Sequence, residues 1–128
     1  MRIRTLISIQ TLAVTLLLPS AARAHHGNIA FNMDKVLTVK GMVREFQWTN
    51  PHTFVILLVD DGHGQQVEWT LEGRSPGVLL RAGWTRKSMQ PGETVTIDFN
   101  PAKDGGHSGL VEHVRKADGS VLPGQPGE

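Results

Sequence analysis

The order of strand-like and helical segments is the feature that most constrains the fold of this chain. Five segments have the apolar content or the alternation of β-strands, and only one segment has the signals of a helix. Because the helical segment follows the third strand-like segment, the chain is expected to be mainly β, with one short helix between strands 3 and 4. The strand-like segments lie at residues 36–48, 53–61, 66–73, 94–99 and 110–116.

The second and third segments predict a hairpin that contributes to the core. "TFVILLVDD" is apolar on both phases, which indicates a strand that is covered on both faces. "DGHG" at 61–64 supplies the turn, and the segment after it alternates. The alternation directs Val67, Trp69 and Leu71 inward.

The first segment is long and contains a bend and a change of phase. Leu37, Val39, Gly41 and Val43 lie on one phase, whereas Phe46 and Trp48 lie on the other. A β-bulge near Arg44 would explain the change, and Gly41 permits a sharp bend.

The helical segment is short and has clear boundaries. Ser75 suits the N-cap, Pro76 the first helical position, and Gly83 the residue after the end. Leu79 and Leu80 are expected to pack the helix onto the sheet.

Five strands, a long bent first strand and one helix in a chain of this length describe the five-stranded Greek-key barrel called the OB-fold. An open sheet with one helix is the alternative that the pattern also allows. One OB-like domain is expected over residues 25–122, followed by a disordered tail at 123–128.

The first 24 residues are typical of a cleaved Sec-type signal peptide. Arg2 and Arg4 precede an apolar run at 5–18, and small residues follow up to Ala24. The run is too short to cross a bilayer, which takes about 20 residues, so no stable membrane insertion is expected after cleavage. An uncleaved anchor is the alternative. The protein is expected to be periplasmic or secreted, and not a lipoprotein because the chain contains no cysteine.

The net charge of +1 comes from this expected leader. Without the three arginines of residues 1–24, the chain has 10 basic and 12 acidic residues. Nucleic acid is therefore not expected as a partner, because binding to phosphates needs a clustered basic surface.

Histidines are the candidate metal ligands, since no thiolate is available. Cleavage after Ala24 would give His25 a free α-amine beside its ring, with His26 directly after it. His52, in the turn "TNPH", is the expected partner within the fold, and His107, in a glycine-rich loop, is a weaker one. Nitrogen donors of this kind favour copper, and they also suit other divalent metals such as nickel and zinc.

Cleavage after Ala22 would instead make His25 the third residue, the position used by a square-planar amino-terminal copper motif. Both cuts leave a terminus rich in nitrogen donors. The alternative is that these histidines have no metal-binding role.

The tryptophans support a different hypothesis, a non-catalytic module that binds a small ligand or a partner protein on an aromatic strand face. Trp48 and Trp84, with Asn50, are the candidate ligand-binding residues, as aromatic side chains are in OB-folds. Trp69 is expected in the core. An enzyme is the least supported class of function, because no arrangement of serine, histidine and acid can be identified.

Several blocks resemble a family of small exported bacterial proteins that is known only as a domain of unknown function. They are "AHH", "VREFQWTNPHTFV", "VEWTLEG" and "ADGSVL". The double-histidine start of that family matches His25 and His26, and its Asn-Pro-His motif matches residues 50–52. The usual form has a serine where Gly27 stands here. The resemblance implies export and a compact β-rich domain, without an established activity.

Overall fold

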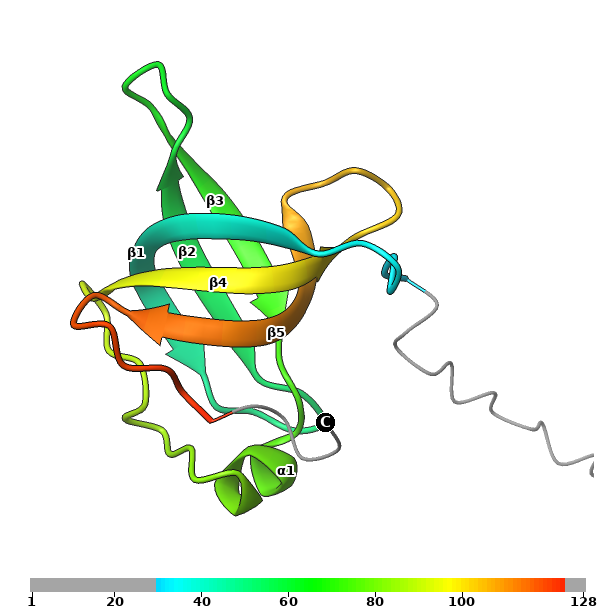
Figure 1. Ribbon diagram of the computed structural model, residues 1–128, viewed down its shortest axis with the longest axis vertical. Helices are drawn as coiled ribbons and strands as arrows, with labels where there is room; N and C mark the ends of the chain where they lie inside the picture. Colours follow the sequence, from blue (N-terminus) through cyan, green and yellow to red (C-terminus); the bar gives the residue numbers. More distant parts are fainter. Residues whose placement is uncertain (1–29, 124–128) are drawn as a thin grey trace, which may run out of the picture.

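The computed structural model describes residues 30–123, which form a closed five-stranded β-barrel with one short helix (Figure 1). The prediction of a mainly β, OB-like barrel with a helix between the third and fourth strands is confirmed. The expected signal peptide and the start of the expected domain at residue 25 lie outside the described residues. The elements are β1 (Leu37–Gln47), β2 (Phe54–Asp60), β3 (Gln66–Glu72), α1 (Pro76–Arg81), β4 (Thr94–Pro101) and β5 (Ser108–Lys116).

Around the barrel the strands follow the order β1-β2-β3-β5-β4, and β4 returns to β1. All neighbours are antiparallel except β3 and β5, which are parallel and pair only through Thr70–Glu72 and Ser108–Leu110. Because of this topology, different connecting segments cover the two ends of the barrel.

Strand β1 belongs to both sides of the barrel. Its first half pairs with β4 and its second half with β2. A Cβ at Gly41 would lie 2.9 Å from the carbonyl oxygen of Leu58, so only glycine allows this close crossing. The register shifts between Val43 and Glu45, which confirms the predicted bulge at Arg44.

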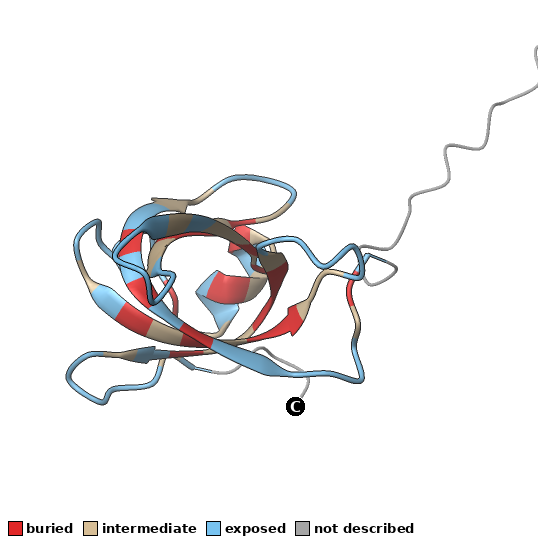
Figure 2. Ribbon diagram, turned by 90° about the horizontal axis from the view of Figure 1, so that it is seen from above, coloured by how far each residue is buried: buried red, intermediate tan, exposed pale blue. Residues whose placement is uncertain are grey.

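The barrel interior is filled by apolar side chains from every strand. One residue of each strand is completely buried, and these residues share the inward phase: Val43, Leu57, Leu71, Ile97 and Val114. Because the side chains of a strand alternate, their neighbours face outward. Figure 2 looks down the barrel and shows the buried positions lining the ring.

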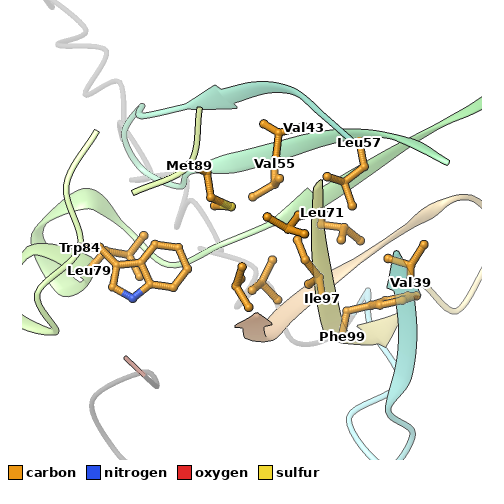
Figure 3. Close-up of a cluster of buried hydrophobic side chains, with 13 residues drawn as sticks. Val39, Val43, Val55, Leu57, Leu71, Leu79, Trp84, Met89, Ile97 and Phe99 are labelled. Atoms are coloured by element: carbon orange, nitrogen blue, oxygen red, sulfur yellow. The ribbon is translucent and has the colours of Figure 1, made fainter. Parts of the chain in front are cut away.

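Helix α1 and the chain after it close one end of the barrel. Ser75 caps the helix by accepting a hydrogen bond from the backbone N–H of Val78, as predicted. Leu79, Trp84 and Met89 pack beneath the strands (Figure 3). The expectation that Leu80 also packs onto the sheet is wrong, because this side chain is 57% exposed on the far side of the helix. Within residues 30–123 no helix is long and apolar enough to cross a membrane.

The closed end also holds the last described residues. The indole Nε1–H of Trp84 donates a hydrogen bond to the carbonyl oxygen of Pro123 at 2.8 Å. Pro123, the first residue of the expected tail, is therefore attached to the barrel, and residues 124–128 lie outside the described part.

Candidate functional site

The turn between β1 and β2 is fixed against the end of β3. The hydroxyl of Thr49 donates to the carbonyl oxygen of His52 at 2.8 Å, which closes the turn. The hydroxyl of Thr53 donates to the carbonyl oxygen of Arg74 at 2.9 Å, and the N–H of Gly73 donates back to Thr53 at 2.8 Å. A Cβ at residue 73 would lie only 2.4 Å from the Thr53 hydroxyl, so this close approach requires glycine.

This fixed turn brings His52 beside Glu72. The Nδ1 atom of His52 lies 2.6 Å from Oε1 of Glu72, and the two side chains are 42% and 21% exposed. An Nδ1–H that donates to a carboxylate leaves Nε2 of the neutral ring as an acceptor, which is the usual arrangement around a metal-binding imidazole. The contact with Glu72 orients the imidazole of His52, and the side chain stays accessible.

Glu72 is a site residue that the sequence analysis missed, although a signal for it exists. In the β2–β3 hairpin, Asp60 pairs with Gln66 next to the turn, and Phe54 pairs with Glu72 at the far end of the two strands. The predicted hairpin therefore already places Glu72 next to the residues that follow the "TNPH" turn.

A groove connects Glu72 with the beginning of the described chain. Its volume is about 450 Å³, and Glu72 and Phe54 line it together with Ala30 and Phe31. Ala30 is held there because its carbonyl oxygen accepts a hydrogen bond from the N–H of Lys103 at 2.9 Å. His25 and His26, the predicted terminal ligands, lie outside the described residues, a few positions before this groove.

His107, the weaker predicted ligand, lies at the other end of the barrel. Its ring packs on the indole of Trp69, with centroids 5.0 Å apart and planes tilted by 31°. Among residues 30–123, no three histidine, aspartate or glutamate side chains are grouped so that they could hold a metal ion. A metal at His52 would need additional donors from the preceding part of the chain.

The predicted aromatic ligand-binding residues do not form one surface. Trp84 is only 4% exposed and is a core residue, because the segment after α1 folds beneath the barrel. Trp48 is half-buried and contacts Phe46 edge to face at 5.6 Å, and Asn50 is exposed in the turn. Trp69, expected in the core, is also only half-buried.

Comparison with known proteins identifies the family. A family model described as "Family of unknown function (DUF6152)" matches residues 14–113, and the chain belongs to this family. The resemblance to an uncharacterised family is thereby confirmed. No curated protein matches this chain.

Among solved structures, the barrel is similar to the mitochondrial single-stranded DNA binding protein Rim1 from S. cerevisiae. The TM-score is 0.49 at 11% identity, and the match covers 70% of this chain and 95% of that chain. This likeness contradicts the expectation that nucleic acid is excluded as a partner, but it concerns the fold alone and assigns no nucleic acid to this chain.

Proposed function

We propose that this member of the family of unknown function binds one divalent metal ion, with copper(II) as the preferred ion. His25 and His26 would supply the terminal amine and imidazole nitrogens, and His52 would supply Nε2. The observation that carries the proposal is the 2.6 Å contact between Nδ1 of His52 and Glu72, since it holds the ring with Nε2 free.

The proposal requires the segment before Ala30 to reach His52. Four chain steps separate His26 from Ala30, and an extended chain covers at most about 3.5 Å per step, or about 14 Å in total. Ala30 and Glu72 line the same groove, so the segment before Ala30 starts from the groove that leads to His52. This groove is the route by which the proposal brings the terminus to the imidazole of His52.

The donor set favours copper on chemical grounds. The ligands would be nitrogen atoms, with a carboxylate behind His52 and no thiolate, and such sets bind copper(II) more strongly than the other common divalent metals. The proposal includes export, because the α-amine of His25 is free only when a leader has been removed after Ala24. The role is binding, without a catalytic step.

The test is a copper(II) titration of the protein as the cell produces it, after intact mass spectrometry has identified its first residue. We expect one tightly bound ion per chain. His52→Ala should weaken binding at least tenfold, and Glu72→Gln about tenfold, because loss of the orienting partner of a ligand has effects of this size. His63→Ala is the matched control, since His63 is an exposed histidine in the β2–β3 turn.

Two results would contradict the proposal. Tight copper binding that His52→Ala leaves unchanged would show a terminal site that does not involve the barrel. Weak binding that no histidine variant changes would show that the terminal histidines are not ligands.

A non-catalytic module for a small ligand is the second candidate function. The burial of Trp84 removes the aromatic face that the sequence predicted. The observation that favours this candidate is the open end of the barrel, where Trp69 lines a hollow.

A further inference from the structure

The end of the barrel opposite α1 contains a hollow of about 380 Å³. It lies between the segment before β1 and the loop that joins β4 to β5, which run beside one another in Figure 1. Hollows of this size hold small molecules in many proteins, and the mouths of β-barrels are common places for them. No residue of this hollow is a ligand of the proposed metal site, and His107, the weaker predicted ligand, lines the hollow instead.

The walls of the hollow are fixed by hydrogen bonds between distant parts of the chain. The N–H of Asn32 donates to the carbonyl oxygen of Pro101 at 2.9 Å. The side-chain amide of the buried Asn100 donates to the carbonyl oxygen of Lys35, also at 2.9 Å. The segment before β1 is thereby attached to the end of β4, so a ligand would meet a site that is already formed.

The floor of the hollow is aromatic. Trp69 contacts Phe99 edge to face at 5.4 Å and His107 at 5.0 Å. Leu37, which is 37% exposed, adds an apolar wall. A flat apolar ring can pack against such a surface, because stacking on an aromatic side chain contributes beyond the burial of area alone.

The rim is basic. Lys35 and Lys103 line the hollow, and no aspartate or glutamate does. The carboxylate of Asp104, in the same loop, accepts a hydrogen bond from the N–H of Gly106 at 2.8 Å and lines the other groove. Within residues 30–123 neither lysine takes part in an ion pair, so both ammonium groups are available to an anion.

We infer that this hollow binds a small planar aromatic carboxylate. The ring would pack against Trp69 and Leu37, and the carboxylate would face Lys35 and Lys103. This inference does not depend on the metal proposal: none of its residues is a proposed metal ligand, although Lys103 also lines the groove beside Glu72, and it can hold whether or not copper binds.

The test is a titration with 2-naphthoate, followed by NMR chemical shifts of the backbone amides in a buffer that contains a chelator. We expect saturable shifts at the amides of residues 32–37 and 102–107. The double variant Lys35→Glu/Lys103→Glu should bind at least tenfold more weakly. Lys40→Glu, which makes the same change at an exposed lysine of β1 that does not line the hollow, should remain within twofold of the parent. The chelator ensures that failure of the metal proposal does not affect this result.

The inference is overturned if 2-naphthoate causes no saturable shifts at these residues. It is also overturned if Lys40→Glu weakens binding as much as the double variant, or if neutral 2-naphthylmethanol binds as tightly as the carboxylate. Thermal unfolding of each variant verifies that the exposed lysine changes leave the fold intact.

Discussion

At the closed end of the barrel, Leu79, Trp84 and Met89 lie beneath the strands with at most 4% of their surface exposed. At the open end, Leu37 is 37% exposed and Trp69 is half-buried beneath a loop. The apolar area at the closed end is removed from water and stabilises the fold. The open end keeps part of its apolar surface available. One barrel therefore combines an end that contributes stability with an end that can accept a ligand.

The two ends also differ in how the sequence specifies them. The helix at the closed end has its own local signals, since Ser75 caps it and Gly83 adopts a positive φ of 96° after it. The open end is assembled by contacts between residues far apart in the chain, such as Asn32 and Pro101. Local signals can be recognised in a sequence, whereas contacts of the second kind depend on the completed barrel.

Truncation of Leu79 should have the largest effect on stability. Leu79→Ala removes a completely buried side chain and leaves a cavity, so we expect a loss of about 2–5 kcal/mol in the free energy of unfolding. Urea denaturation measures this loss. Leu80→Ala, one residue along the same helix and 57% exposed, is the control and should cost well under about 1 kcal/mol. Equal losses for the two variants would contradict the assignment of α1 as the barrel cap.

The same truncation at the open end should change stability little and binding more. Leu37→Ala should lower the free energy of unfolding by no more than about 1 kcal/mol, because the side chain is already partly in water. Its affinity for 2-naphthoate should fall about threefold, since part of the apolar wall is lost. Met42→Ala is the control, because Met42 has the same exposure of 37% on the same strand and does not line the hollow. If both variants lose the same affinity, the comparison between the ends fails.

The smallest effect is expected in the turn that leads the chain back to the closed end. The carboxylate of Asp118 accepts hydrogen bonds from the hydroxyl of Ser120 at 2.6 Å and from its N–H at 2.8 Å, and these bonds lower the pKa of Asp118 below 3.8. A lowered pKa in the folded state means that the ionised carboxylate adds stability above pH 3.8 and that this contribution disappears as the pH falls through the lowered pKa. Asp118→Asn should therefore unfold at a slightly lower temperature at neutral pH. The difference between the thermal midpoints of variant and parent should shrink as the pH falls through the lowered pKa, and a difference that stays constant in acid would contradict the assignment.

Much of the barrel could be predicted because its strands carry their own patterns. Gly41 and the change of phase at Arg44 indicated the bend and the bulge, and both are present. The hairpin turn at residues 61–64 also sets the register that pairs Phe54 with Glu72, so counting residues outward from the turn would have revealed this pair. Pairing within a hairpin depends on few residues, so the sequence is sufficient.

Burial of the tryptophans could not be predicted in the same way. The alternation of β3 correctly turns Trp69 toward the inside, but it does not show that this residue lies near an open end and stays partly exposed. Trp84 follows a helix, and its burial depends on how the segment after α1 crosses the barrel and on the contact with Pro123. Both outcomes follow from the position of each residue relative to the ends of the barrel, which periodicity does not encode.

The parallel contact of β3 with β5 has a consequence for how the barrel opens. If the pairs of Thr70–Glu72 with Ser108–Leu110 separate, the ring becomes a curled ribbon in the order β3-β2-β1-β4-β5, with every antiparallel pair intact. The β3–β5 pairing is short, and parallel pairing is slightly less stable per residue than antiparallel pairing. The barrel would therefore open first between β3 and β5. Glu72 belongs to the β3–β5 pairing, and Trp69 directly precedes it. A molecule bound at either proposed site would therefore keep β3 and β5 paired, and its binding would slow the opening of the whole barrel.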